Sequence, residues 1–516
     1  MLEPAWAHLR GGRWSEAQAA FRQALAQDAG SVPARMGLAR AASASGDWLT
    51  AAAWLSDACR LVPRDREPAV SLGELLIAQR QFGQAVAVYR RLYDDLDDRD
   101  RATLLHLGYS LEQTFELDEA IERYTEAAMR EPGFLEAHVN LAGVLWRVGR
   151  FDDALAHART AVQLGPNHPH AVRMLGMALL NLNRVDEAEL QSRRALSLAP
   201  DLAAAQFDLA SCLLLAGRLD EGWEWYGKRW NDPARLRRPP FYDAALEWRG
   251  PSQSLQGQSV VVYAEQGMGD AIQLLRYVPK LQRLGARVVC AVHTALVPLV
   301  EYSFGVECLT PERGTQVDLH AALLDLPLRF RTTLDDVPSP GAYLQAPPQH
   351  VAKWRHRIAP SPKLKVGLAW SGWTRQVNNR NRAIALSELQ PLLDLEGVQW
   401  FSLQKGDAGS FTDTETSKLV DLTGEWNDFA DSAAMLGELD LVITVDTVVA
   451  HLAGAVGREC WVMLPPNPDF RWLLDRDDSP WYASLRLFRR GFEADGRARQ
   501  VAAVRDALAA RVARAT

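Results

Sequence analysis

A spacing of 34 residues recurs through the first two-fifths of the chain and constrains its fold more than any other feature of the sequence. Small residues follow this interval at Ala120, Ala154, Ala188 and Gly222. A second series consists of Ala127, Ala161 and Ala195, and a third of Pro132, Pro166 and Pro200. The pattern is looser upstream, where Ala17 and Ala51 keep the same step. Because three residue classes share one period, the sequence predicts a repeated structural unit.

The residue types in the repeat are typical of paired antiparallel helices. Two helices approach closely where a small side chain lies between them, and a proline ends the second helix. Each hairpin leaves an apolar face that its neighbour must cover, so successive hairpins stack into a superhelix with a concave groove. The pattern resembles the tetratricopeptide family, and we expect about six or seven units over residues 1–230. Capture of a peptide or protein in the groove is the functional prediction; an array that only spaces or dimerises the chain is the alternative.

Composition sets broad limits on the class of protein. Hydrophobic residues make up 48% and charged residues 23% of the chain, as in soluble globular proteins. The net charge of −7 argues against a nucleic-acid-binding surface over the whole molecule. No apolar run approaches the ~20 residues of a membrane span and no signal peptide is expected, so we predict a cytoplasmic protein. The five cysteines lie far apart, which predicts buried free thiols rather than disulfides or a zinc site.

A connector is predicted at residues 231–258, where the repeat pattern ends. Prolines, glycines and polar residues follow one another there, together with a basic cluster formed by Arg235, Arg237 and Arg238. Aromatic residues such as Trp248 predict that the connector packs against a neighbouring domain. The basic cluster is interpreted as a solvated face, with a site for an acidic ligand as the alternative.

The remainder of the chain alternates short apolar runs with amphipathic stretches. The runs occupy residues 259–265, 286–292, 306–309, 364–370, 398–404, 439–446 and 460–465. Strands that alternate with helices predict parallel βαβ units. We therefore predict an α/β fold of two Rossmann-like domains that face each other across a cleft, at residues 259–345 and 346–490. A C-terminal helix is expected at residues 491–516.

Two common nucleotide-binding motifs are excluded by the sequence. Gly267 and Gly269 follow the first apolar run, but Ile272 stands where a dinucleotide fingerprint requires its third glycine. The chain contains no P-loop motif. No close set of histidine, cysteine and carboxylate side chains suggests a metal site. We expect neither a metal nor a cofactor.

Five segments carry a resemblance to a known enzyme family: EQGMGDAIQLLRY, GLAWSG, NNRNRAIAL, FSLQKG and DLVITVDTVVAHLAGAVGRECWVMLP. They resemble the heptosyltransferase-like branch of the GT-B glycosyltransferases over residues 240–490. With the repeats included, the chain is similar to bacterial proteins such as the flagellin glycosyltransferases, and its layout is similar to that of the O-GlcNAc transferases. The most specific piece is Asp446-Thr447 followed by His451 at a strand-to-helix junction.

The residues of this junction suit a sugar-nucleotide donor. Free N–H groups of Thr447 and Val448 at a helix start would cradle the diphosphate, and Lys405 would supply a fixed positive charge in place of a metal. Further candidate donor-binding residues are Asp446 and His451 for the ribose or phosphates, Ser371 and Gly372 in a second loop, and Arg382 for a phosphate. For several of these residues a structural role is the alternative. Asp446 could cap the helix, His451 could be a packed core residue, and Lys405 could lie in an exposed turn.

The sequence leaves two candidates for the catalytic base. The resemblance points to Asp270, and Glu265 at the end of the first apolar run is the competitor. Alternatively, Asp270 caps the following helix, and Gly267 and Gly269 serve only the turn. The acceptor would be a serine or threonine hydroxyl of a protein.

The leading prediction is thus a metal-independent glycosyltransferase that modifies a protein, with flagellin as the partner that the resemblance implies. The nucleotide sugar is its donor substrate, and neither nucleic acid nor a membrane span is expected. Two alternatives remain: a non-catalytic repeat scaffold, and a transferase that acts on a glycolipid or polysaccharide.

Overall fold

The computed structural model describes residues 2–232, 236–309, 317–339, 341–374, 376–405 and 418–515. The chain divides into two compact units, Met1–Met174 and Leu175–Thr516. The first unit is helical, and the second contains the end of the helical repeats together with parallel sheets and their helices. The finer domain boundaries expected from the sequence stay predictions.

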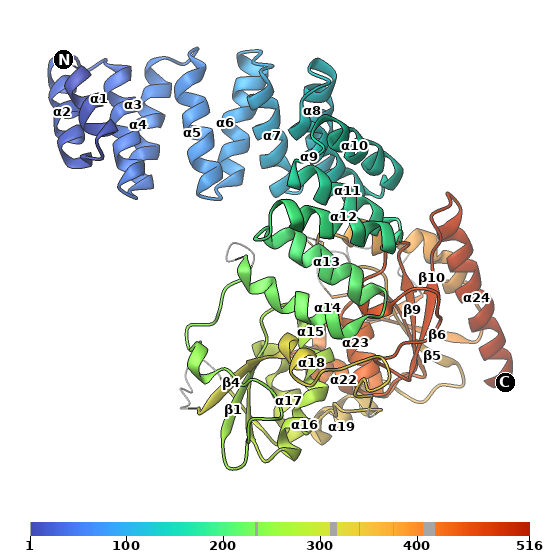
Figure 1. Cartoon of the computed structure of the whole chain (residues 1–516). Coiled ribbons are helices and arrows are strands. Elements are labelled where there is room, and N and C mark those ends of the chain that lie inside the picture. Colours follow the sequence, from blue (N-terminus) through green and yellow to red (C-terminus); the bar gives the residue numbers. More distant parts are fainter. Residues whose placement is uncertain are drawn as a thin grey trace. The chain divides into compact units, whose positions relative to one another are not determined.

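The first unit is a row of helical hairpins, drawn in blue to teal in Figure 1. Its helices are α1 (Leu2–Arg10), α2 (Trp14–Gln27), α3 (Val32–Ala44), α4 (Trp48–Leu61), α5 (Arg66–Ala78), α6 (Phe82–Asp95), α7 (Arg101–Gln113), α8 (Leu117–Arg130), α9 (Leu135–Leu145) and α10 (Phe151–Leu164). Helix α11 (Pro169–Asn181) begins in this unit and ends in the second. Each helix from α1 to α9 packs against the next helix along the chain, as a stack of hairpins requires.

The small residues of the repeat lie where helices meet. Ala120 and Ala154 are completely buried. Gly73 and Gly108 face aromatic rings of the following helix, and an added Cβ would lie 2.4 Å from the Tyr89 ring and 2.6 Å from the Tyr124 ring. Ala120 and Ala154, which are 34 residues apart, confirm the predicted small residues between paired helices, and Gly73 and Gly108 are further close contacts of the same kind.

The second unit begins with the remaining repeat helices. These are α12 (Val185–Leu198), α13 (Ala203–Leu215) and α14 (Leu219–Tyr226), and a 3₁₀ turn at Gly227–Asn231 follows. The connector then packs onto the first sheet: Trp248 is completely buried, and its main-chain N–H donates to the His320 carbonyl at 2.9 Å. Arg238 stacks over the Trp230 and Tyr242 rings. Arg235 lies outside the described residues.

Two parallel sheets follow in the same unit (Figure 1). The first has the order β3-β2-β1-β4 and contains β1 (Ser259–Tyr263), β2 (Arg287–Ala291), β3 (Glu307–Cys308) and β4 (Leu319–Ala322). The second has the order β10-β9-β8-β5-β6-β7 and contains β5 (Leu364–Ala369), β6 (Val398–Ser402), β7 (Leu419–Asp421), β8 (Leu441–Val445), β9 (Cys460–Leu464) and β10 (Leu485–Arg489). The predicted α/β architecture is confirmed at this level. The sequence analysis missed β4, β7 and β10.

The helices around the sheets are mostly short. They are α15 (Met268–Leu274), α16 (Val278–Arg283), α17 (Val297–Phe304), α18 (Leu326–Arg329), α19 (Pro348–Arg357), α20 (Asn379–Arg382), α21 (Gln390–Leu393), α22 (Phe429–Gly437), α23 (Val448–Ala455) and α24 (Gly496–Ala515). Within the described ranges, no helix is both long and apolar enough to cross a bilayer. The five cysteines are free and buried, as predicted.

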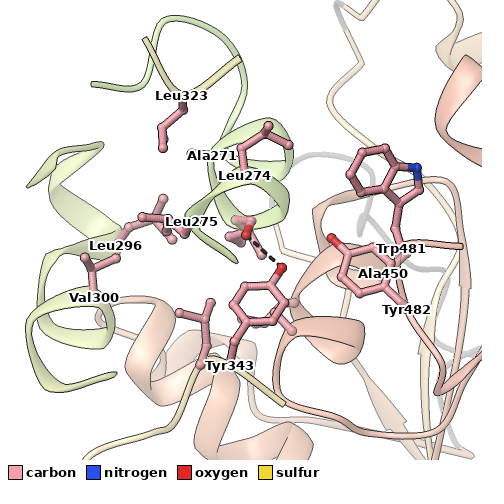
Figure 2. Close-up of a cluster of buried hydrophobic side chains, with 14 of the residues drawn as sticks. Ala271, Leu274, Leu275, Leu296, Val300, Leu323, Tyr343, Ala450, Trp481 and Tyr482 are labelled. Atoms are coloured by element: carbon pink, nitrogen blue, oxygen red, sulfur yellow. Dashed lines mark hydrogen bonds between the residues drawn. The ribbon is translucent and has the colours of Figure 1, made fainter. Parts of the chain in front are cut away.

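One apolar core joins the elements of the two sheets. Strands β1, β8 and β9 are buried along their whole length, as expected for strands covered on both faces. Figure 2 shows Tyr343, from the link between the sheets, directed at helix α15; its hydroxyl donates to the Ile272 carbonyl at 2.9 Å. Tyr482 and Trp481 belong to the same core and lie beside Ala450 of α23. The core therefore brings α15 and α23 together.

Candidate functional site

The candidate site lies at the carboxyl ends of β1 and β8. Each of these strands is followed by a helix, and the two helices are in contact. Helix α15 follows β1, helix α23 follows β8, and the two helices pack against each other. An added Cβ at Gly269 would lie 2.9 Å from Cδ2 of His451, so a larger residue would separate them. The carboxyl ends of parallel strands are where α/β proteins bind their ligands.

Asp270 stands in the first turn of α15 with both carboxylate oxygens engaged. Oδ2 accepts a hydrogen bond from the main-chain N–H of Gly267 at 2.9 Å. Oδ1 forms an ion pair with Arg471. The Asp270 side chain is 22% exposed. It therefore has the helix-capping contact that the sequence left open, and it still reaches the surface.

Arg471 is a site residue that sequence reasoning missed. It lies in a 3₁₀ turn at Phe470–Trp472, and its guanidinium contacts Asp469 at 2.7 Å and Gln273 Oε1 at 2.7 Å in addition to Asp270. Burial alone would lower the pKa of Arg471, but Asp469 and Asp270 raise that pKa above its ordinary value. Arg471 is 201 residues from Asp270, and no sequence pattern indicates that the two residues pair.

Glu265 follows β1 and is buried in a second ionic cluster. Its Oε1 lies 2.5 Å from Arg229 Nη2, and Arg229 Nη1 lies 2.6 Å from Asp325 Oδ1. Both side chains of the Glu265–Arg229 pair are only 2% exposed. Burial raises the pKa of Glu265 to about 7, although Arg229 acts in the opposite direction. The other oxygen, Oε2, has no hydrogen-bond partner among the described residues.

Thr447, rather than Asp446, caps helix α23. The Thr447 hydroxyl accepts from the Val449 N–H at 3.2 Å and lies 3.0 Å from the Thr444 hydroxyl. Val448 is the first residue of the helix. The half-buried Asp446 precedes this cap and does not itself cap the helix. Burial raises the pKa of Asp446, and Arg382 opposes this shift.

Arg382 connects the second loop to the start of α23. Its Nη1 donates to the Asp446 carbonyl at 2.8 Å, and its Nε donates to Asn379 Oδ1 at 3.3 Å. Asn379 also accepts from the Gly372 N–H at 3.1 Å and donates to the Ser371 hydroxyl at 3.3 Å. The structure thus brings Ser371, Gly372, Arg382 and Asp446 together. Asn379 joins them, although the sequence analysis gave it no role.

His451 is buried one turn into α23. Its ring stacks on Trp472 with centroids 5.4 Å apart, and Nδ1 lies 3.0 Å from the Tyr482 hydroxyl. Burial, together with Arg471, Arg276 and Arg382, holds the pKa of His451 well below its ordinary value. The imidazole is therefore neutral near pH 7.

Lys405 follows β6 and is exposed. Its ammonium donates to the Trp426 carbonyl at 2.8 Å. The next residue, Gly406 of the FSLQKG segment, lies outside the described residues.

In the part of the chain that the structure describes, one group of possible metal ligands occurs, formed by His350, Asp428 and Asp431. It lies at α19 and α22, apart from the residues predicted from sequence. Asp431 Oδ1 already accepts from Lys353 at 2.8 Å and from Trp354 at 2.9 Å, and Asp428 caps α22. These hydrogen bonds give Asp428 and Asp431 structural roles at α19 and α22.

The helical part of the chain matches a known class of repeat. Residues 2–66, 105–169, 139–202 and 173–233 match the model of the tetratricopeptide repeat, so the N-terminal part of the chain carries tetratricopeptide repeats. Among curated proteins, the chain is 29% identical over 300 residues to Protein FlbA of Caulobacter vibrioides. That match covers 52% of this chain and 49% of the relative, so the chain spans about half the length of the curated relative it matches.

Three of the solved structures that the chain matches are tetratricopeptide proteins. One is TTC0263, a thermophilic tetratricopeptide protein of Thermus thermophilus, at 21% identity and a TM-score of 0.30, over 36% of this chain and all of that one (100%). Another is YrrB, described as a tetratricopeptide protein with an unusual peptide-binding site, at 17% identity and a TM-score of 0.31, over 36% of this chain and 95% of that one. A third comes from Parabacteroides merdae, at 14% identity and a TM-score of 0.35, over 38% of this chain and 78% of that one.

Proposed function

We propose that this chain is a GT-B glycosyltransferase that moves a sugar from a nucleotide-activated donor to a serine or threonine of a protein held by its repeats. The observation that supports the proposal most is the meeting of α15 and α23 at the carboxyl ends of two parallel sheets. Two Rossmann-like domains joined at this edge are the layout of a GT-B enzyme. In the proposal, the second domain binds the donor and the first supplies the catalytic base.

Donor binding is assigned to the start of α23 and the neighbouring arginine. Main-chain N–H groups at a helix start, with the positive end of the helix dipole, stabilise a phosphate. Arg382 adds a guanidinium that is already fixed by the Asp446 carbonyl and by Asn379. As the bond between the sugar and the diphosphate breaks, the electron pair and the negative charge pass to the diphosphate. Fixed positive groups stabilise that charge without a metal ion.

Asp270 is the proposed base, and its surface exposure supports this choice over Glu265. In the transfer, the acceptor oxygen bonds to the anomeric carbon and its proton passes to a carboxylate. The Asp270 side chain is 22% exposed, whereas that of Glu265 is 2% exposed. An acceptor hydroxyl can therefore approach Asp270, whereas Glu265 is enclosed by Arg229 and the surrounding core. A base must lie within hydrogen-bond reach of the proton that it removes.

The acceptor is proposed to be a protein because the same chain carries tetratricopeptide repeats. Repeats of this kind form extended surfaces that hold other proteins. Flagellin is the acceptor that the sequence resemblance implies.

The alternative of a non-catalytic scaffold is favoured by one observation. Both oxygens of Asp270 are engaged, one by Arg471 and one by Gly267, so the carboxylate must release a partner before it can accept a proton. Donor binding separates the two functions, because a scaffold has no use for a sugar nucleotide.

The test is thermal unfolding of the full chain with four nucleoside diphosphate sugars: UDP-N-acetylglucosamine, GDP-mannose, ADP-glucose and dTDP-rhamnose. A ligand at 100 times its Kd stabilises the folded state by about 2.7 kcal/mol, so a true donor raises the melting temperature measurably. We expect Arg382→Ala and Lys405→Ala to lose this shift. Lys363→Ala is the control, because Lys363 is exposed and precedes the amino end of β5, at the opposite edge of the sheet. If none of the four sugar nucleotides binds, the scaffold function replaces the enzyme.

A further inference from the structure

The last repeat hairpin contacts the loop that leads into α15. Tyr226 ends α14, and its hydroxyl accepts from Gln266 Nε2 at 3.0 Å. Arg229 lies in the 3₁₀ turn that follows α14 and pairs with Glu265. Glu265 and Gln266 are the two residues that precede Gly267, where the turn into α15 begins.

Arg229 joins three elements through one guanidinium. Nη2 binds Glu265 after β1 at 2.5 Å, and Nη1 binds Asp325, in the turn after β4, at 2.6 Å. The same Nη1 donates to the Tyr226 carbonyl at 3.3 Å, and Trp230 Nε1 donates to the other oxygen of Asp325 at 3.4 Å. The arginine is 2% exposed, and removing one partner of such a buried ion pair leaves an uncompensated charge.

The same hairpin also supports the partner of Asp270. Trp223 and Tyr226 of α14 meet the Phe470 ring edge-on, with centroids 5.7 and 5.8 Å apart. Phe470 precedes Arg471, whose guanidinium pairs with Asp270. One hairpin thus contacts the segments on both sides of Asp270: the turn before α15 and the turn that carries Arg471.

We infer that Arg229 is a positioning residue of the transferase site and that the last tetratricopeptide hairpin is part of that site. This inference rests on the proposed function. Arg229 holds Glu265, and through it the main chain between β1 and α15, so that Asp270 faces the acceptor hydroxyl. In this arrangement the catalytic unit begins within the repeats, so removing residues 1–230 would delete part of the active site together with the acceptor-binding array.

The charged groups around Glu265 determine how the variants should behave. Arg229 faces it from the hairpin, Asp325 from the turn after β4, and Asp270 from α15. Without Arg229, two buried carboxylates would share a site with no cation, and one of them would have to take up a proton. The double variant Arg229→Gln with Glu265→Gln removes that conflict.

The experiment measures hydrolysis of the sugar nucleotide by the full chain, in which water replaces the acceptor hydroxyl and the nucleotide is released. The donor is whichever of the four sugar nucleotides above binds. Arg229→Gln should lower kcat about 100-fold, because small displacements of a catalytic group have effects of this size. The affinity for the nucleotide should change less than about 2-fold, since the donor contacts lie at α23. Arg229→Lys should restore most of the rate. The double variant should be no slower than either Arg229→Gln or Glu265→Gln alone, because both changes act through one contact.

Arg147→Gln is the matched control. Arg147 is 8% exposed and pairs with Glu112 at 2.9 Å within the first unit, so this variant also loses a buried arginine–glutamate pair. It should lower the melting temperature and leave kcat for nucleotide release unchanged.

Several results would overturn the inference. They are an unchanged kcat in Arg229→Gln, an equal loss of kcat in Arg147→Gln, or independent effects of the two substitutions in the double variant. In these cases sugar-nucleotide binding by the wild-type chain still stands, so the proposed function survives. If the wild-type chain binds none of the four sugar nucleotides, the proposed function and the inference both fail.

Discussion

The contact between the Tyr124 ring and Gly108 allows the packing of the repeats to be tested by adding a single methyl group. Gly108 lies within α7, and the ring of Tyr124, from α8, rests against it. A Cβ added at Gly108 would lie 2.6 Å from Cε1 and 2.8 Å from Cδ1 of that ring. Carbon atoms in contact prefer separations of about 3.5–4.0 Å, so the ring must move by about 1 Å.

The expected effect of Gly108→Ala combines one stabilising and two destabilising contributions. Alanine favours a helix interior over glycine by about 1 kcal/mol. Overpacking a filled core costs about 1–3 kcal/mol. A displaced ring also weakens the hydrogen bond from the Tyr124 hydroxyl to Glu112 Oε2, now 3.3 Å long, and a bond to a charged acceptor contributes about 1.5–3 kcal/mol. With that hydrogen bond lost, the net expectation is a loss of about 1.5–5 kcal/mol of local stability.

Gly83→Ala is the matched control because it makes the same change in an open place. Gly83 lies in α6, and nothing lies within 4 Å of its added Cβ. It should be neutral or stabilising by up to about 0.5 kcal/mol, because Gly83 lies in the first turn of α6, where helix propensity has a smaller effect than in the middle of a helix. The two variants are compared by urea unfolding followed by circular dichroism, and by hydrogen exchange of the α7 and α8 amides. Exchange is needed because a chain of two compact units need not unfold in one step.

The reasoning is refuted if Gly108→Ala is as stable as Gly83→Ala, with unchanged protection of α7 and α8. That result would mean that the hairpin accepts a methyl group without displacing Tyr124.

Two further predictions concern the site. Because the pKa of Glu265 is raised from 4.5 to about 7, ionising it destabilises the folded state progressively between about pH 4.5 and 7, by about 3 kcal/mol in total. Glu265→Gln should therefore gain stability relative to the wild type as the pH rises through this window; a pH-independent difference in unfolding free energy would contradict the raised pKa. Thr447→Ala should lose about 1 kcal/mol, as expected for a helix N-cap, whereas Thr447→Ser should keep most of it. Equal melting temperatures of Thr447→Ala and the wild type would show that the cap contributes nothing.

The repeats and the α/β alternation could be predicted because their signals are local. Small residues at a 34-residue interval, and the prolines that follow the second helix of three hairpins, act within one hairpin, whatever the rest of the chain does. The buried strands β1, β5, β6, β8 and β9 are likewise marked by their own apolar residues. Strand β4 is only four residues long, and β10 interrupts its apolar residues with arginines, so neither gave a clear pattern.

The sequence by itself determined which segments form the repeat hairpins and seven of the ten strands, and it singled out the loops that end β1, β5 and β8. Only the tertiary structure decided what these loops contact. The partner of Glu265 is 36 residues away and that of Asp270 is 201 residues away, and Thr447 rather than Asp446 took the cap. Ion pairs of this kind have no periodicity, because they depend on which elements the core brings together. For that reason the 34-residue repeat could be predicted from the sequence, whereas the role of Arg229 at its end could not.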